Sequence, residues 1–524
     1  MKAIRISITS VFLCAVTVYA EPANFVVARL LREGFTLVEA GPDWRTWART
    51  NDVVFDQGKV VGRTNAVIEL QTGMNIWSSE QSRWMAAVPL LSLQNDRIVG
   101  SGARHQVKFA ENLNSPNAVQ VLLPGSANRS PTWLKLNLLG LAFVDPSFPN
   151  AKDALIAEVH DSIAQVDGNT VVYNDVFDGV KASVRYNYSV SGVSQEIVIQ
   201  ERLPLPESLG LTQNARLIAI TEVVEGPEPQ TEDRAWSASR QTVHDATLDF
   251  GGMTFIPGRA FRLGLPGDSL HGVPVSKAYS RVDQRRVILE SLPYEQIQNV
   301  LQNLPAASAS TNGSAALTTP RRWLARGSLP PPAVQSAARV LHAAKLQAPS
   351  PDGLLIDWDL VLNSFLRDMT FYSHALNGDS YLIQGDVRLC GSTTVMPGAL
   401  IRYASGSIYI DGQIVWPDAP DVGVPKALFT SVNDDDPVSL FANHPPLSQI
   451  EYGPALVVNP SDLANAMRHI NVRYASPGII PDRPTGLPTI SVSTVAPHAD
   501  NVSGKAGQFR IMRNGGWPRR CPRT

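Results

Sequence analysis

Apolar and polar residues alternate most regularly between Gly179 and Val190. Every second position from Val180 to Val190 is valine, alanine or tyrosine, and the positions between them are lysine, serine, arginine or asparagine. A period of two predicts a β-strand with one buried and one solvated face. Residues 191–192 are a turn signal, and residues 195–201 have the composition of a returning strand. The pattern predicts an antiparallel sheet in the N-terminal part of the chain.

A different pattern occupies residues 393–430, where short aliphatic strands alternate with tight corners. Ile401 shares one strand face with Ala399 and Tyr403, while Arg402 lies on the other, which predicts that the Ile401 face is inward. Such alternation is typical of a chain that winds into a parallel β-helix with stacked aliphatic residues. The expected strands, here and downstream, are residues 394–396, 399–403, 407–411, 426–430, 455–458 and 469–475.

One amphipathic helix stands out after these N-terminal strands. We expect Ser291 to cap it and Pro305 to end it. Spacings of three and four residues place its apolar side chains on one stripe, which we expect to pack against the preceding sheet. The stripe consists of Tyr294, Ile297, Leu301 and Leu304.

Composition divides the chain further. Residues 305–352 are rich in Pro, Ala and Ser, as linkers are, and include a short helical pattern at 333–346; a surface loop within one large domain is the alternative. The expected fold is mainly β, with an antiparallel N-terminal region, a linker, a short parallel β-helix-like solenoid and a partial β-sandwich. The expected parts are a signal peptide at 1–20, the β-rich region at 21–304 (a division near 150 stays open), the linker at 305–352, the solenoid at 353–485, and sandwich strands or a disordered tail at 486–524.

The N-terminus has the pattern of a secretory signal peptide. Lys2 and Arg5 precede an apolar run from Ile6 to Val18, and a small residue, Ala20, ends the segment. The run is shorter than the roughly 20 apolar residues that a spanning helix needs, and no later run reaches that length. We therefore expect a secreted or cell-surface protein without a transmembrane segment after cleavage.

Charge and cysteine content narrow the partners. Residues 1–20 contain two of the 45 bases and none of the 47 acids, so removing them leaves 43 against 47, a net charge of −4. This balance gives no electrostatic support for nucleic-acid binding. Charged residues are 18% of the chain, below the roughly 25% of an average domain, which favours a β-rich extracellular protein. Whether Cys390 and Cys521 pair stays open.

Several segments carry a resemblance to known proteins. Residues 393–412 (TTVMPGALIRYASGSIYIDG), followed by KALFTS, resemble the coils of bacterial right-handed parallel β-helix proteins. Residues 63–77, 153–168 and 179–206 resemble the N-terminal region of very large secreted bacterial repeat proteins, to which no chemistry is attached. Residues 488–516 look like the first strands of a Calx-beta-like sandwich. Because the chain ends soon afterwards in GGWPRRCPRT, the resemblance implies a truncated or frameshifted relative of a longer surface protein.

Two motifs suggest chemistry that their surroundings do not support. Gly267-Asp268-Ser269-Leu270 spells the signature of the GDSL hydrolases, but no Asp-x-x-His follows, and a serine without a positioned base is a weak nucleophile. We interpret this segment as a turn. The nine histidines include no pair at the i, i+4 spacing of a helical zinc site.

Asp434, Asp435 and Asp436 form the densest acidic run of the sequence, directly after Asn433. Carboxylate and amide oxygens are the ligands that Ca²⁺ takes in proteins. The run lacks the spaced ligands of an EF-hand loop, and solvated acids are common at a solenoid turn. It is the one metal candidate in the sequence, and no other cofactor is indicated.

Asp357, Asp359 and Asp386 are the candidates for a carboxylate pair that acts on glycosidic bonds. The sequence does not establish whether they face each other. Tryptophans near these positions and upstream either stack on sugar rings or pack internally. These are Trp77, Trp84, Trp358 and Trp416.

The sequence as a whole favours a secreted structural or adhesion protein without catalytic residues, whose partner is a polysaccharide or the cell envelope. A rigid solenoid suits that role because it holds an extended surface without needing a pocket. The alternative is a polysaccharide-active β-helix enzyme, a lyase or a glycoside hydrolase. Carboxylates or Arg/Lys side chains clustered on one face of the solenoid would favour the alternative.

Overall fold

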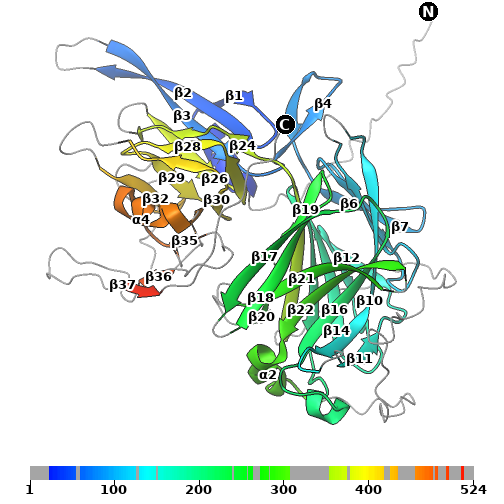
Figure 1. Cartoon of the computed structure of the whole chain (residues 1–524). Coiled ribbons are helices and arrows are strands. Elements are labelled where there is room, and N and C mark those ends of the chain that lie inside the picture. Colours follow the sequence, from blue (N-terminus) through cyan, green and yellow to red (C-terminus); the bar gives the residue numbers. More distant parts are fainter. Residues whose placement is uncertain are drawn as a thin grey trace, which may run out of the picture.

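Two β-structured bodies, an antiparallel body and a solenoid, lie side by side in the computed structural model (Figure 1). Neighbouring strands pair antiparallel in the first body, whereas the strands of successive turns pair parallel in the solenoid. The structure describes residues 23–54, 60–125, 129–148, 152–238, 241–256, 258–263, 272–282, 284–306, 353–374, 378–417, 425–434, 455–458, 460–475, 478–481, 491–494 and 509–512.

The antiparallel body is a barrel-like arrangement of two linked sheets. One sheet contains β6 (Leu90–Gln94), β7 (Arg97–Ser101), β8 (Gln106–Ala110), β9 (Val119–Leu123), β10 (Thr132–Asp145), β11 (Lys152–Glu158), β16 (Arg216–Glu225), β21 (Val273–Val282) and β22 (Arg285–Pro293). The other contains β12 (Ala164–Asp167), β13 (Thr170–Tyr173), β14 (Ala182–Tyr188), β15 (Gly192–Ile199), β17 (Gln230–Ala238), β18 (Gln241–Asp249), β19 (Met253–Ile256), β20 (Gly258–Arg262) and β23 (Leu354–Leu362).

The predicted hairpin is confirmed as β14 and β15, which pair antiparallel. Alternate residues of β14, among them Val184 and Tyr186, lie in the core between the two sheets. Arg185 and Asn187 lie on the opposite face, only partly covered. The period-two pattern therefore identified the strand and its inward face correctly.

The predicted helix is α2 (Tyr294–Gln302), and its stripe residues are buried in the core of the antiparallel body. Its cap was predicted wrongly. Ser291 pairs with Ile218 inside β22, so it cannot start the helix, and Pro293 occupies the N-cap position. A short 3₁₀ helix, η1, spans Pro206–Leu209.

The solenoid consists of three stacks of parallel strands. The first stack has β26 (Asp379–Ile383), β29 (Leu400–Tyr403), β32 (Ala427–Ser431) and β34 (Ile470–Val472). The second has β24 (Leu366–Arg367), β27 (Val387–Cys390), β30 (Ile408–Ile410), β33 (Leu456–Val458) and β35 (Ile479–Pro481). The third has β25 (Thr370–Phe371), β28 (Ser392–Val395) and β31 (Gln413–Val415). The expected β-helix-like winding is thus present, and α4 (Pro460–His469) packs on it through Leu463 and Ala466.

The inward face of the solenoid was predicted correctly, but its outer face was not. Ile401, Ile408 and Ile410 lie in the solenoid core. Arg402 was expected on a solvated face, yet it is 2% exposed. The outer face of this stack is covered, because Leu382, the register neighbour of Arg402, packs in a second cluster that includes Leu30 of the helix α1 (Ala23–Arg32), among others.

The topology moves two of the expected boundaries. Strands β1 (Thr36–Ala40), β2 (Trp44–Val54) and β3 (Val60–Leu70) extend the first solenoid stack, since β3 pairs parallel with β26. Figure 1 shows these blue strands beside the yellow solenoid strands. Conversely, β23 was expected in the solenoid but pairs with β15, β19 and β20 of the antiparallel body.

Some expected segments fall partly or wholly outside the described residues: the signal peptide, the linker at 307–352 and the GDSL segment. Of the expected sandwich strands, the structure describes an antiparallel pair, β36 (Ser491–Thr494) and β37 (Phe509–Met512). Within the described ranges, no helix has the length and apolar character needed to cross a membrane.

Candidate functional site at the junction of the two bodies

A buried carboxylate ties the solenoid to the antiparallel body. Asp43, between β1 and β2, is 2% exposed. Its Oδ1 accepts hydrogen bonds from the Gly73 N–H at 2.6 Å and from Arg104 Nη1 at 3.0 Å. The Ser364 hydroxyl donates to Oδ2 of the same carboxylate. Arg104 comes from the antiparallel body and Ser364 directly follows β23, so this carboxylate fixes the two bodies against each other.

Gly73 allows the close approach at this junction. Its φ is +76°, in the left-handed region that favours glycine, and a Cβ at this position would lie 2.2 Å from the Val190 carbonyl oxygen and 2.8 Å from Leu362 Cδ1. The next peptide upstream adds a further link, because the Thr72 N–H donates to the Asp386 carbonyl at 2.9 Å. The turn after β3 therefore packs directly on the antiparallel body and holds the corner that contains Asp386.

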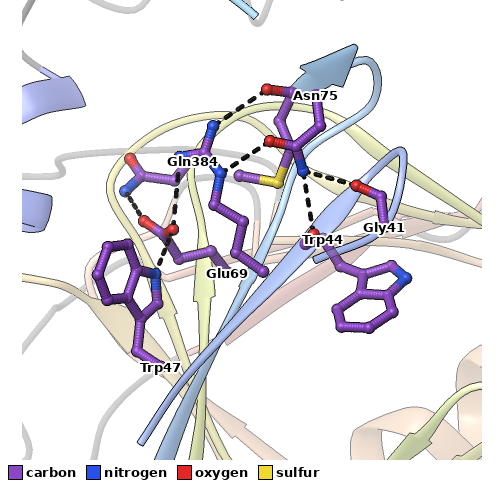
Figure 2. A network of polar contacts seen from close by, with 8 residues as sticks. Gly41, Trp44, Trp47, Glu69, Asn75 and Gln384 are labelled. Carbon is purple, nitrogen blue, oxygen red and sulfur yellow. Dashed lines mark hydrogen bonds and ion pairs between the residues drawn. The ribbon is translucent and has the colours of Figure 1, made fainter. Parts of the chain in front are cut away.

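A second polar network holds β2 and β3 to the solenoid (Figure 2). Glu69 in β3 is fully buried. Trp47 Nε1 donates to its Oε2 at 2.6 Å, Gln384 Nε2 donates to its Oε1 at 3.1 Å, and Arg45 Nη1 lies 3.7 Å from Oε2. A fold tolerates a buried charge that is paired and hydrogen-bonded in this way, whereas removing one partner strongly lowers the free energy of unfolding. This network fixes β3, and with it the turn that carries Gly73.

Two of the three candidate carboxylates lie on the outward face of β23. Trp358 between them is 3% exposed and belongs to the core, so it packs internally and is not available to a sugar. Asp357 stands opposite Glu196 of β15, and Asp359 stands opposite Ser194. The backbone N–H of Arg259 donates to Asp357 Oδ1.

The third carboxylate, Asp386, comes from the solenoid. It occupies the corner between β26 and β27, and its Oδ1 accepts the N–H of Ser407, in the corner one turn further on, at 2.9 Å. Tyr409, the middle residue of β30, pairs in register with Arg388 of β27. Its neighbours in the strand face the solenoid core, so Tyr409 faces outward.

Carboxyl groups of both bodies act on the pKa of Asp359. Burial, followed by the negative charges of Asp357 and Asp386, raises this pKa to about 7. Burial also raises the pKa of Asp357 to about 6. The negative charge of Asp386, followed by burial, raises the pKa of Tyr409, so its hydroxyl stays protonated. Asp386 of the solenoid therefore lies within electrostatic range of Asp359 in the antiparallel body.

Burial and two neighbouring groups act on the pKa of Asp386 in opposite directions. Burial raises its pKa, but the Ser407 N–H and the Arg388 guanidinium oppose that rise. Arg388 in turn lies 3.4 Å from Asp411 and over the ring of Phe365, 5.0 Å from its centroid. Asp386 retains an exposed surface and Asp359 a partly exposed one, so solvent and ligands reach both.

The polar surface continues from β23 onto β15, β14 and β13. Arg185 and Glu196 form an ion pair at 2.8 Å. Asn187 Nδ2 donates to Ser194 Oγ and to Glu196 Oε1, both at 3.2 Å, and Thr170 Oγ1 donates to Asn187 Oδ1 at 2.7 Å. These side chains give the outer face of the sheet a row of hydrogen-bonding groups next to the three carboxylates.

We call Asp357, Asp359, Asp386 and Tyr409 the junction site. A carboxyl group with a pKa near 7 both donates and accepts protons near neutral pH, as general acids and bases do. The protonated hydroxyl of Tyr409 adds a hydrogen-bond donor, and the carboxyl oxygens of Asp386 add acceptors. The site can therefore bind a hydroxyl-rich ligand, and it contains the groups for proton transfer to such a ligand.

The acidic run lies elsewhere. Asp434 is 4% exposed in the turn after β32, where it accepts a hydrogen bond from Thr430 Oγ1 at 2.6 Å and lies 3.4 Å from Arg473 Nη1. Asp435 and Asp436 fall outside the described residues. Within the part of the chain that the structure describes, no group of three acidic, histidine or cysteine side chains could hold a metal ion. The calcium site stays a prediction.

The remaining candidates are placed as follows. Cys390 is buried in β27 and disulfide-bonded, while Cys521 lies outside the described residues. Trp416 stacks on the His469 ring at a centroid distance of 5.4 Å. Trp77 is 55% exposed and Trp84 is half-buried, so these two do not belong to the core.

Sequence reasoning found the three aspartates of the junction site but missed Tyr409. The sequence did contain a signal for this residue. Tyr409 lies between Ile408 and Ile410, which face inward, so its own side chain faces outward. The comparisons add no relative: no family model matches the chain, and no curated protein matches it.

Proposed function

We propose that this chain is a secreted or cell-surface adhesion protein that binds polysaccharide at the junction site. One observation carries the proposal: carboxylates from two separate bodies meet beside an outward tyrosine. Ligand sites occur preferentially where two structural units meet, because residues from both can converge there. Clustered carboxylates are also the feature expected of the alternative, a polysaccharide-active enzyme, so binding and cleavage must be tested separately.

The side chains of the site match the chemistry of a sugar. Carboxylates accept hydrogen bonds from hydroxyl groups, amides both accept and donate them, and the ring of Tyr409 offers an apolar face. The row of Arg185, Asn187 and Ser194 extends the hydrogen-bonding surface, which suits a chain of sugars better than a single one.

The charge of the site favours a neutral or amino-sugar polysaccharide. The negative charges of Asp357 and Asp386 act on Asp359, while Arg388 is already engaged with Asp411. A uronic acid or sulfated polymer would place further negative charge beside them, which is unfavourable because like charges repel at short range. We therefore expect weak binding of pectate and alginate.

Secretion is part of the proposal. The signal-peptide pattern of residues 1–20 supports it, and so does the disulfide of Cys390, since structural disulfides persist in oxidising compartments.

Hydrolysis of the bound polysaccharide is the second candidate function. The presence of carboxyl groups from both bodies favours it, because glycosidases use two carboxyl groups that flank the bond to be cleaved. In this reaction Asp359 would donate its proton to the glycosidic oxygen, and Asp386 would take a proton from the attacking water. The glycosidic C–O bond breaks, a new C–O bond forms to the water oxygen, and exchange with solvent restores both carboxyls.

The test uses purified protein on a panel of immobilised chitin, chitosan, cellulose, xylan, pectate and alginate, scored for retention and for release of reducing ends. We expect retention on neutral or amino-sugar polymers. Tyr409→Ala should weaken retention about tenfold, the effect of losing one good hydrogen bond and its ring contact. Tyr372→Ala is the matched control, because Tyr372 is also a solenoid tyrosine but is 47% exposed and outside the site.

Asp386→Asn separates binding from cleavage, and Asp368→Asn is its control. Both aspartates are exposed corner residues whose Oδ1 accepts a serine N–H at 2.9 Å in the next turn. If the wild-type protein releases reducing ends, only Asp386→Asn should abolish release. Retention without release supports adhesion alone. No retention on any polymer, or equal losses in Tyr409→Ala and Tyr372→Ala, contradicts the proposal.

A further inference from the structure

A pair of tryptophans lies on the hairpin of β4 (Asn75–Ser78) and β5 (Arg83–Ala86). Trp77 and Trp84 stand directly opposite each other in the antiparallel register, so both indoles lie on one face. Their ring centroids are 5.5 Å apart in an edge-to-face arrangement. Trp77 is 55% exposed, which is uncommon for a side chain that gains so much from burial.

The base of this hairpin is held firmly. Asn75, its first residue, is 1% exposed, and its Nδ2 donates to the carbonyls of Gly41 at 2.6 Å and Trp44 at 3.1 Å (Figure 2). Arg45 completes the contact, because its Nε donates to Asn75 Oδ1 at 2.9 Å and its Nη2 donates to the Met74 carbonyl at 3.1 Å. Three hydrogen bonds thus join this end of the hairpin to β2, and a fourth joins it to Gly41, just before β2.

The tip of the hairpin is polar. Residues 79–82 are all exposed, and they are serine, glutamate, glutamine and serine. The turn is closed by the Gln81 N–H, which donates to Ser78 Oγ at 3.2 Å. The indole pair therefore lies between the fixed base of the hairpin and a rim of hydrogen-bonding side chains at its tip.

We infer that the Trp77–Trp84 face is a second polysaccharide-binding surface, on which the apolar face of a sugar ring stacks against the exposed indole. This inference rests on the proposed function, because it takes the same class of ligand at a different place. A pyranose ring has an apolar C–H face bordered by hydroxyls, and the hairpin offers an indole bordered by polar side chains. Two sites on one chain would strengthen attachment to a polymer, because the second contact forms intramolecularly.

A protein partner fits this surface less well. Protein interfaces have an apolar core made of several contiguous side chains within a polar rim, and stable ones bury about 800 Å² on each partner. On the Trp77–Trp84 face, the neighbouring cross-strand pair is Asn75 with Ala86, of which Asn75 is buried. The exposed apolar surface on this face is centred on one indole, the size of a single sugar ring.

The two tryptophans also hold the hairpin together, since cross-strand aromatic pairs stabilise antiparallel strands by up to about 1 kcal/mol. This role does not require that Trp77 be accessible. The experiment must therefore separate a loss of hairpin structure from a loss of ligand contact, and Trp77→Tyr does so by keeping an aromatic pair while shrinking the ring.

The test is affinity electrophoresis of the full chain in gels containing soluble chitosan or hydroxyethyl cellulose, with tryptophan fluorescence during titration by chito- and cello-oligosaccharides. We expect Trp77→Ala to reduce affinity about tenfold and Trp77→Tyr to reduce it less. The wild-type emission should move to shorter wavelength on saturation, and this shift should be lost in Trp77→Ala. Leu93→Ala is the control, because Leu93 is an apolar side chain of β6 that is 58% exposed.

The outcomes distinguish the two sites. Weaker binding in Trp77→Ala with unchanged binding in Tyr409→Ala supports the hairpin surface and contradicts the junction site. The reverse result contradicts the hairpin surface and leaves the proposed function intact. Unchanged electrophoretic mobility of Trp77→Ala, or a fluorescence shift caused by phosphatidylcholine vesicles and not by oligosaccharides, overturns the inference.

Discussion

Replacing Asp359 by asparagine should stabilise the protein at alkaline pH, although the residue lies in the candidate site. The ordinary pKa of an aspartate is 3.8, and burial with the nearby Asp357 and Asp386 raises that of Asp359 to about 7. A raised pKa means that the folded protein resists ionisation of this group. As pH rises from about 4 to 7, the unfolded chain ionises first, so stability is lost over this interval.

The magnitude follows from the difference between the two pKa values. A pKa raised from 3.8 to about 7 corresponds to at most about 4 kcal/mol of destabilisation at pH 8. Asparagine has nearly the same shape and no charge to bury. We therefore expect Asp359→Asn to match the wild-type free energy of unfolding near pH 4 and to exceed it increasingly up to pH 8, by a few kcal/mol.

Urea denaturation of both proteins at pH 4, 5, 6, 7 and 8 measures this difference in the free energy of unfolding. Groups that titrate in the same way in both proteins do not contribute to the difference. Asp368→Asn, at an exposed corner outside the junction, should show no such trend. If the gap between Asp359→Asn and the wild type is constant with pH, or narrows toward pH 8, the pKa of Asp359 is not raised in the folded protein. A site residue whose removal stabilises the fold is typical of functional positions, where stability is sacrificed for chemistry.

Three further outcomes test the scaffold of the site. Gly73→Ala should lower the free energy of unfolding by more than 3 kcal/mol in urea denaturation, because it adds a backbone clash to an unfavourable φ. Gly168 also has a positive φ, +55°, but open space around it, so Gly168→Ala should lower the free energy of unfolding by only about 1 kcal/mol. Glu69→Ala should lower the free energy of unfolding by about 3–5 kcal/mol in the same measurement, because the buried donors lose their acceptor. Glu39 is exposed, so Glu39→Ala should lower it by less than about 0.5 kcal/mol, and equal effects of the two substitutions would contradict the network. Burial lowers the pKa of His105 to about 4, so the wild type should lose up to about 3 kcal/mol as pH falls from 6.5 to 4, and His105→Gln should not show this loss in thermal unfolding at the same pH values.

Structural features that depend on residues close together in the chain could be predicted from the sequence. The alternation in β14 and the corners around β29 and β30 depend on contacts within one hairpin or one turn, and these strands were found with their inward faces. Features set by distant segments were not readable. Arg402 looked solvent-facing because its strand gives no sign of the α1 cluster that covers the outer face of the stack.

The candidate site shows the same division. The side-chain types at Asp357, Asp359 and Asp386 identified them as carboxylates of interest, and their parity placed the first two on one face of a strand. Their approach to one another depends on β23 joining the antiparallel body and on the turn at Gly73, neither of which has a local signal. The sequence identified Tyr409 only as an outward-facing residue, and its relation to Asp386 became clear only from the structure.

The pairing of β3 with β26 has a consequence for how this chain reaches its native state. It joins Val67 to Ser380, residues separated by on the order of 300 positions, most of which form the antiparallel body. During synthesis, one edge of β3 has no partner until that whole body has left the ribosome, and an unpaired strand edge promotes aggregation. The slow step of folding should therefore be the closure of this pairing, after the antiparallel body has formed, and chaperones that shield strand edges should raise the yield most strongly in that interval.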